Sequence, residues 1–514
     1  MKKTYQDKIF VNESFLAAAV IFLALVVRIL HVIFTAKLDP LAGDLTLDAA
    51  IYDQWAKFLV WGGEDVPTRL MQAPLFPWFV SVIYRIAGPG LTAVRVAHAI
   101  LGTLTCALMI TSTRRLFRSS TAGILAGAIM ALYLPAIFYE GVLVPATLIL
   151  FLNTLFVFLL VPESGYPVKP RLLLAGFVLG LSVIAKPVAL LLLPFALVHL
   201  ALRMNKARPR FSTGSFVGRS GLIFAGLIMA VAPLTIRNSI VSGEFIPLTT
   251  GGGINLYIGN NPKANGFYSI PAYRGQSLGG TPEVQQARMR TIAESESGEK
   301  LSASEVSSFW LREGIRHDIE NPGSFFHLLW QKTLFFWNRY ERASVESLTF
   351  HRRFGGILSL PLLTFGLVAP FALLGIFLSR ERAGRLWLLY GGALTYFAAA
   401  LAFYVLARYR LPVVVFLIPL AAAAVTGLLK LLRDRRWTEL ALMFATLFLI
   451  VRLVNTIVAK DTAAGEAGYH TRLGIVYAGK GERQLAREAF TEALRLDPSN
   501  KGARMGLDAM DRSR

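Results

Sequence analysis

The chain has 514 residues, of which 54% are hydrophobic and 17% are charged, and its mean hydropathy is +0.52. This composition excludes a soluble enzyme of that length and predicts that the bilayer is the main solvent. The formal net charge of +21 does not indicate nucleic-acid binding, because the Lys and Arg residues lie mostly in short tracts between apolar runs.

Apolar runs that are long enough to cross a bilayer recur along the chain. A helix needs about 20 mostly apolar residues to cross the hydrocarbon core. The first run has no small-residue cleavage site after it, so we interpret it as an uncleaved span. The predicted fold class is an all-α polytopic membrane protein with about eleven transmembrane helices. The runs lie near residues 14–34, 91–113, 121–139, 141–161, 172–186, 187–202, 218–236, 357–378, 385–404, 411–430 and 437–458.

Lys and Arg collect in alternate connections between these runs. By the positive-inside rule, these connections face the cytoplasm together with the N-terminus. An odd number of spans then places the loops 35–90 and 237–356 and the tail after residue 459 on the outer side. We therefore expect a multi-pass protein of the cytoplasmic (inner) membrane, with its active site and C-terminal module facing outward. The basic residues are Arg114, Arg115, Arg118, Arg203, Lys206, Arg208, Arg210, Arg380, Arg382, Arg385, Lys430, Arg433, Arg435 and Arg436.

The first outer loop carries carboxylates next to an aromatic helical face. Asp48, Tyr52 and Trp55 fall on one face of a predicted helix, and Asp44 precedes them. A carboxylate near apolar groups at the membrane surface has a raised proton affinity, which suits a general base in group transfer. A solvated amphipathic helix with Asp44 as its cap is the alternative explanation of the same pattern.

Two further segments complete the candidate site. Residues 74–87 are apolar but too short to cross the bilayer, so we predict a re-entrant or interfacial helix. Glu140 lies in a tight outer turn between the third and fourth spans, and an ionisable group at such depth is a functional candidate. We predict that Glu140 shares a site with Asp48, with a solvated turn glutamate as the alternative.

These patterns together resemble the GT-C superfamily of membrane glycosyltransferases, in the branch of protein O-mannosyltransferases and lipid A aminoarabinose transferases. Asp48 with Tyr52 resembles the catalytic first-loop motif of that family. The Ala-Pro-Leu-Phe-Pro-Trp segment at 73–78 resembles the proline-aromatic motif that follows, and Glu140 its second acidic motif. Similar bacterial members also open the large loop as residues 233–262 do here. The resemblance covers most of residues 14–430.

The resemblance implies transfer of a hexosyl or pentosyl unit from a polyprenyl-phosphate-linked donor to a protein, lipid or glycan acceptor on the outer side of the membrane. The anomeric carbon would be inverted, with Asp48 as general base. Gln72 stands where aminoarabinose transferases carry a lysine, so the donor sugar need not be the same. A lipid-linked glycan polymerase or ligase, a transporter and a scaffold that displays a repeat module stay open as alternatives.

A site of this kind needs cations opposite the base to hold the leaving phosphate. Lys186, Arg237, Arg408 and Arg410 lie at suitable depth. We favour Arg408 and Arg410, because the planar guanidinium gives paired hydrogen bonds to phosphate. Snorkelling at a helix end is the alternative for each. The full set of predicted site residues is Asp48 and Glu140 for catalysis, and Asp44, Tyr52, Gln72, Lys186, Arg237, Asn260, Asn261, Arg408 and Arg410 for substrate.

The loop 237–356 is long enough to form a lid or small subdomain. Asn260 and Asn261 are turn residues first and candidate sugar or acceptor contacts second. The seven histidines are scattered without a metal-ligand spacing, so we predict that no metal and no further cofactor is required.

The C-terminal segment is predicted to be a separate helical module, so that the two domains are residues 1–458 and 466–514. Its small and large residues follow the spacing of a tetratricopeptide repeat, although His470 replaces the leading tryptophan. Residues 501–512 supply a capping helix, because one repeat cannot bury its own apolar face. We expect this module to dock on the outer loop, to dimerise or to recruit a protein partner. The matching positions are Leu473, Gly474, Tyr477, Ala486, Phe490, Ala493 and Pro498.

Overall fold

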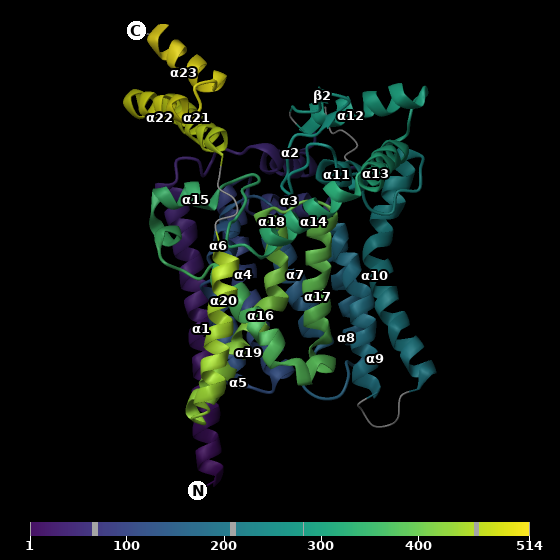
Figure 1. The fold of residues 1–514 in the computed structure, drawn as a ribbon, viewed down its shortest axis with the longest axis vertical. Helices are drawn as coiled ribbons and strands as arrows, with labels where there is room; N and C mark the ends of the chain where they lie inside the picture. The colour runs from purple at the N-terminus through teal and green to yellow at the C-terminus, as the bar shows by residue number, and fades with distance from the viewer. Residues whose placement is uncertain (1, 64–69, 206–211, 281, 457–461, 513–514) are drawn as a thin grey trace.

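The computed structural model describes residues 2–63, 70–205, 212–280, 282–456 and 462–512. Long helices run side by side through the middle of the molecule, and shorter helices cover one end of them (Figure 1). The N-terminal end of α1 lies at the opposite end of the bundle from α2, α13 and the C-terminal helices. The predicted domain boundary at residue 458 and the basic residues Lys206, Arg208 and Arg210 lie outside the described residues.

Most of the predicted apolar runs coincide with a helix of the bundle, apart from shifts at the ends, whereas the run 121–139 is divided between α5 and α6. Six helical stretches among the described residues are long and apolar enough to cross a membrane, and α5, α7 and α16 are shorter apolar helices. The count of eleven crossings therefore stays a prediction. The bundle consists of α1 (Lys2–Leu38), α4 (Leu91–Phe117), α5 (Ser120–Ala131), α7 (Ala146–Leu160), α8 (Lys169–Ala185), η1 (Pro187–Leu191) with α9 (Leu192–Asn205), α10 (Thr213–Ser242), α16 (Phe365–Leu378), η4 (Arg380–Arg382) with α17 (Ala383–Ala402), α18 (Ala407–Arg410) with η5 (Leu411–Val413) and α19 (Val414–Arg433), and α20 (Trp437–Asn455).

Shorter elements from the two large loops, together with α6 from the connection between α5 and α7, cover the end of the bundle at which α2 lies. Only one strand pair, of two residues each, interrupts the helices in the described part of the chain, so the predicted all-α class is confirmed. These elements are α2 (Leu47–Trp61), α3 (Leu75–Ala87), α6 (Leu134–Gly141), α11 (Gly252–Gly259), β1 (Ala272–Tyr273), β2 (Gln276–Ser277), α12 (Pro282–Ser297), α13 (Ala303–Glu320), α14 (Pro322–Trp337), α15 (Leu348–His351), η2 (Arg352–Phe354) and η3 (Gly356–Ser359).

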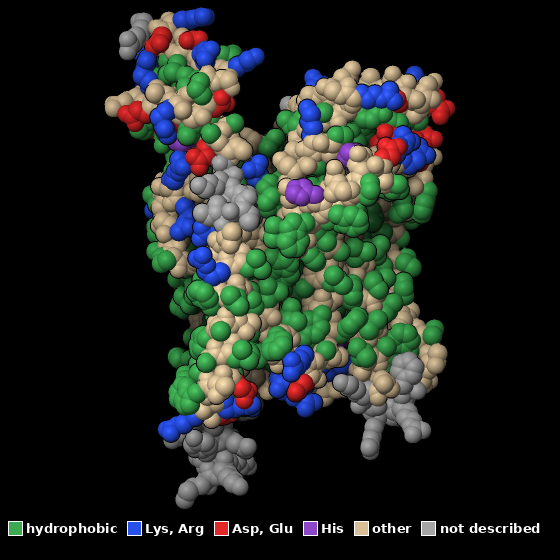
Figure 2. Space-filling model, in the orientation of Figure 1, with side chains coloured by type: hydrophobic (Ala, Val, Ile, Leu, Met, Phe, Trp, Pro, Cys, Tyr) green, Lys and Arg blue, Asp and Glu red, His purple; other side chains and the backbone are tan. Residues whose placement is uncertain are grey.

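Apolar side chains cover the middle of the bundle, and charged side chains gather at its two ends (Figure 2). This distribution is the one expected of a protein surrounded by lipid, so the chain is a multi-pass membrane protein. Small residues let the helices approach closely. A Cβ atom on Gly176 of α8 would lie 2.0 Å from the carbonyl oxygen of Ile223, and one on Gly226 of α10 would lie 2.1 Å from that of Leu173.

The C-terminal module consists of α21 (Ala463–Gly479), α22 (Arg483–Leu496) and α23 (Lys501–Arg512). Phe490 is the centre of its small core, with 1% of its surface exposed. Glycines from the flanking helices contact this ring: a Cβ on Gly474 or on Gly506 would lie within 2.6 Å of it. Packing against Phe490 therefore requires a glycine at position 474 of the repeat and at position 506 of the capping helix.

Candidate active site

Asp48 lies in the first turn of α2 and pairs with Arg408, which lies 360 residues further along the chain. The distance between Asp48 Oδ2 and Arg408 Nη2 is 2.6 Å, and 28% and 12% of the two side chains are exposed. Arg408 belongs to α18, the single turn at which the chain enters the long helical stretch of α19. The structure thus joins the predicted base to one of the predicted phosphate ligands.

A second cation lies beside this pair. Lys186, at the turn between α8 and η1, points its Nζ at the ring of Tyr409 at 3.0 Å from the centroid. The Nη2 group of Arg408 donates to the hydroxyl of Tyr409 at 3.3 Å. The Nε group of Arg408 is buried and has no hydrogen-bond partner among the described residues. The carboxylate of Asp48 and two basic side chains, Arg408 and Lys186, therefore lie together, and the buried Nε group of Arg408 is a donor available to an anionic ligand.

Aromatic rings enclose this cluster. Tyr52 is 8% exposed and packs edge-on against Phe76 of α3 at 5.3 Å. Burial, together with the charge of Asp48, raises the pKa of Tyr52, so it stays a neutral hydroxyl. On the other side, the ring of Tyr268 from the large loop packs against Tyr404 at 5.5 Å.

Arg410 differs from Arg408, although only one residue separates them. Its guanidinium donates to the backbone carbonyls of Phe336 and Tyr340, both at 3.0 Å, and to that of Asn338. It also pairs with Glu341 at 2.8 Å and is 3% exposed. Its donors are thus used within the protein, where they hold the end of α14 against the turn that carries Arg408.

Asn260 and Asn261 follow α11 and are both 3% exposed. The amide of Asn260 donates to the carbonyl of Ala402 at 2.7 Å, and its oxygen accepts from Lys332 at 2.9 Å. The amide of Asn261 donates to the carbonyls of Tyr257 and Ile258. Their polar atoms are used to attach the large loop to α17 and to close the turn after α11.

Gln72 lies just before α3, and Arg237 lies near the end of α10, where the large loop begins. Gln72 is half-buried next to Leu70, whose carbonyl accepts from the backbone of Thr250 at 2.9 Å. Arg237 of α10 donates to Asn238 at 3.1 Å. Within the described residues, no hydrogen bond or ion pair joins either side chain to Asp48.

Glu140 of α6 does not join Asp48. Its Oε1 accepts from Arg28 Nε of α1 at 3.0 Å, and the two side chains are 1% and 0% exposed. Gly102 of α4 makes room for the pair, because a Cβ there would lie 2.2 Å from Glu140 Oε1. The arginine within the first apolar run is the sequence signal that could have identified this partner.

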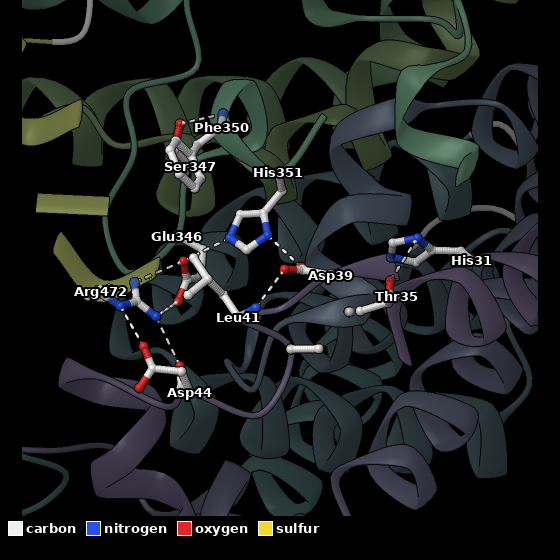
Figure 3. A network of polar contacts seen from close by, with 12 residues as sticks. His31, Thr35, Asp39, Leu41, Asp44, Glu346, Ser347, Phe350, His351 and Arg472 are labelled. Carbon is white, nitrogen blue, oxygen red and sulfur yellow. Dashed lines mark hydrogen bonds and ion pairs between the residues drawn. The ribbon is translucent and has the colours of Figure 1, made fainter. Parts of the chain in front are cut away.

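Asp44 is bound by the C-terminal module (Figure 3). Arg472 of α21 contacts Asp44 Oδ2 at 2.8 Å and donates to the Asp44 carbonyl at 2.9 Å. The same guanidinium pairs with Glu346 at 3.0 Å, and Glu346 in turn contacts His351 at 2.9 Å. The sequence analysis missed Arg472, Glu346 and His351, because no local pattern links residues so far apart.

Within the described residues, no group of three or more His, Cys, Asp or Glu side chains could hold a metal ion. The expectation that the chain requires no metal stays a prediction.

Comparison with known families identifies two parts of the chain. Residues 71–235 match the model of the dolichyl-phosphate-mannose-protein mannosyltransferases, and residues 467–500 match the tetratricopeptide repeat. The predicted resemblance to membrane glycosyltransferases is thereby confirmed for the first of these segments, and the predicted repeat for the second. Residues 71–235 thus belong to a segment that matches a glycosyltransferase family. A search of curated proteins found no match.

Solved structures of membrane glycosyltransferases are also similar to the chain. The oligosaccharyltransferase AglB of Archaeoglobus fulgidus, in complex with an inhibitory peptide and a dolichol phosphate, is 13% identical, with a TM-score of 0.46 over 87% of this chain and 58% of that one. ArnT of Cupriavidus metallidurans, bound to undecaprenyl phosphate, is 15% identical, with a TM-score of 0.35 over 80% and 78%. This chain therefore spans less than two thirds of the length of the archaeal enzyme.

Proposed function

We propose that this protein is an inverting glycosyltransferase that moves a sugar from a polyprenyl-phosphate-linked donor to an acceptor on the outer side of the membrane, with Asp48 as general base. The observation that carries the proposal is the convergence of Asp48, Arg408 and Lys186 at the end of the bundle. The family match over residues 71–235 supports the reaction class.

The reaction needs one proton acceptor and positive charge at the leaving group. The acceptor oxygen or nitrogen gives its proton to the Asp48 carboxylate and bonds to the anomeric carbon. The bond from that carbon to the phosphate oxygen breaks, and its electron pair stays on the phosphate. Arg408 and Lys186 stabilise the charge that develops there. When the donor phosphate binds Arg408, Asp48 loses its ion-pair partner and becomes free to act as the base.

The contacts of the other predicted site residues suggest different roles for them. Arg410, Asn260 and Asn261 hold the loop and the 407–410 turn in place, and so act on Arg408 through the backbone. Tyr52 closes the apolar side of the cluster. Gln72 and Arg237 are proposed as contacts for the donor or acceptor at the rim. Glu140 pairs with Arg28 and not with Asp48. Any contribution of Glu140 to catalysis would therefore be indirect, through the position of α6.

The test is transfer from a polyprenyl-linked sugar by the full-length protein in lipid vesicles, with the product identified by mass spectrometry. We expect Asp48→Asn to lower kcat by roughly 10²- to 10⁴-fold, which is the usual contribution of a general base. The matched control is Asp53→Asn, which makes the same change on the same helix. Asp53 accepts instead from Tyr84 at 2.6 Å and from Lys57 at 2.7 Å. Transfer by Asp48→Asn at the parent rate would contradict the proposal.

A further inference from the structure

The C-terminal repeat is docked against the bundle. One face of α21 lies on the short helix α15: the ring of Tyr469 stacks on Phe350 at 5.0 Å, and His470 packs edge-on against the same ring at 5.2 Å. Leu473 and Phe350 belong to one apolar cluster that also includes Leu41 of the first loop. Residues 469, 470 and 473 are neighbours on a helix surface, so this face is already covered within the chain.

Arg472 lies at the edge of this contact and holds two acidic groups from different loops. Its guanidinium contacts both the side chain and the backbone carbonyl of Asp44, and it binds both carboxylate oxygens of Glu346 at 3.0 and 3.2 Å (Figure 3). Only 18% of the Arg472 side chain is exposed. Without this cation, two carboxylates held close together would repel each other.

The segment between Asp44 and Asp48 contains a strained residue. Leu47, directly before Asp48, has a φ of +49°, which is the left-handed region that non-glycine residues rarely occupy. Such a conformation costs of the order of 1 kcal/mol or more and persists only where the surroundings impose it. Leu47 is 51% exposed, so its own side-chain packing contributes little to holding it. Contacts hold the turn on both sides: those of Asp44 with Arg472 lie before Leu47, and the hydrogen bonds from the backbone amides of Ala49 and Ala50 to the Thr46 carbonyl enclose it.

We infer that Arg472 is a positioning residue of the transferase: it anchors Asp44, and thereby holds the strained turn that aims Asp48 at Arg408. The repeat is then part of the catalytic structure and not only a binding module. This inference rests on the proposed function, because it assigns Asp48 the role of the base.

The first test separates positioning from folding by kinetics. A misplacement of a catalytic group by about 1 Å can cost roughly 10²-fold in rate. We expect Arg472→Ala to lower kcat by roughly 10- to 100-fold while KM for the donor changes by less than about threefold. Arg472→Lys keeps the charge but not the planar fork, and should fall in between. The matched control is Arg495→Ala, since Arg495 pairs with Glu492 on the exposed face of α22.

A double-mutant cycle tests whether Arg472 acts through Asp44. If it does, Asp44→Asn and Arg472→Ala impair the same contact, and the double variant should be no slower than the worse single variant within about twofold. The inference would be overturned if the losses of kcat in the two single variants multiplied in the double variant. It would also be overturned if Arg472→Ala kept the parent kcat, or if Arg495→Ala lost as much kcat as Arg472→Ala.

Hydrogen exchange gives a readout that does not depend on activity. In the parent, the backbone amides of Ala42 and Asp44 donate within the turn, to Asp39 and Leu41. We expect Arg472→Ala to raise exchange over residues 40–48 while α22 keeps its protection; unchanged exchange over 40–48 would overturn the inference. If Asp48→Asn is fully active, the proposed function fails, and this measurement still reports whether Arg472 holds the turn.

Discussion

Two Arg–carboxylate pairs in this molecule have similar distances but opposite surroundings. Arg28 and Glu140 meet at 3.0 Å inside the bundle with at most 1% of either side chain exposed. Asp48 and Arg408 meet at 2.6 Å at the end of the bundle, with 28% and 12% exposed. A pair that is fully desolvated on all sides cannot separate without leaving a bare charge, whereas a pair beside an opening can exchange its partner for a ligand. The comparison indicates that burial decides which pair stabilises the fold and which one can take part in chemistry.

The largest expected effect is on the buried pair. Arg28→Met should lower the free energy of unfolding by about 3–5 kcal/mol, because it leaves the Glu140 charge uncompensated. The measurement is thermal unfolding in detergent, compared with Arg408→Met. A double variant, Arg28→Met with Glu140→Leu, removes both charges and should recover most of the loss. Equal destabilisation by Arg28→Met and Arg408→Met would contradict the distinction between the two pairs.

An intermediate effect is expected for His351, which lies between Asp39 and Glu346 and is 6% exposed. Burial lowers the pKa of His351, but the hydrogen bonds to these two carboxylates raise it to about 9, against the usual 6.5. A raised pKa contributes stability that is complete below pH 6.5 and is lost as the pH rises through 9. The shift corresponds to about 3 kcal/mol.

Unfolding of the parent should therefore become easier between pH 6.5 and 10. His351→Gln should show a smaller loss over the same interval, because glutamine does not titrate. The side chains of His31, Asp44, Arg95 and Arg472 also lie near this ring, and variants of His31 and Arg472 test whether the slope belongs to His351. If the stability of the parent and of His351→Gln falls in parallel as the pH rises, the contacts of His351 with the two carboxylates contribute no pH-dependent stability.

The smallest effect on stability, together with a separate effect on activity, is expected at the part-exposed pair of Asp48 and Arg408. Arg408→Lys keeps the charge but loses the paired geometry, so kcat should fall by about tenfold or more. Its melting temperature should stay within a few degrees of the parent, since part-exposed pairs contribute about 1 kcal/mol or less. The assay is transfer in lipid vesicles beside thermal unfolding of the same sample. If Arg408→Lys melts well below the parent but transfers sugar at the parent rate, the Asp48–Arg408 pair stabilises the fold and the assignment of the two pairs is wrong.

Local patterns were sufficient to place most of the helices, including the one that carries Asp48. The 3.6-residue period predicted the helical face of Asp48 and Tyr52, and both lie on α2. The apolar runs predicted the bundle helices, and the spacing around Phe490 predicted the repeat, because these signals arise from each segment's own need to bury apolar surface. The alternation of basic connections favours one orientation in the membrane, which stays a prediction.

The functions of individual polar residues could not be separated in this way. Arg408 and Arg410 looked equivalent as phosphate ligands, yet Arg410 is used by carbonyls of the 336–340 segment and by Glu341. Asn260 and Asn261 were candidate sugar contacts, and their amides bind backbone carbonyls. Whether a side chain is available depends on which backbone groups the fold leaves unsatisfied around it, and this is not encoded in local spacing.

The sequence by itself determined that this chain is a helical membrane protein with a carboxylate helix in its first loop and a repeat at its C-terminus. These properties follow from hydropathy and periodicity, which are local. Only the tertiary structure decided the partners of each charge: Glu140 with Arg28 across 112 residues, and Asp44 with Arg472 across 428. Such pairs form because a desolvated charge must find its counter-ion wherever packing brings one, however far apart the two lie in the chain.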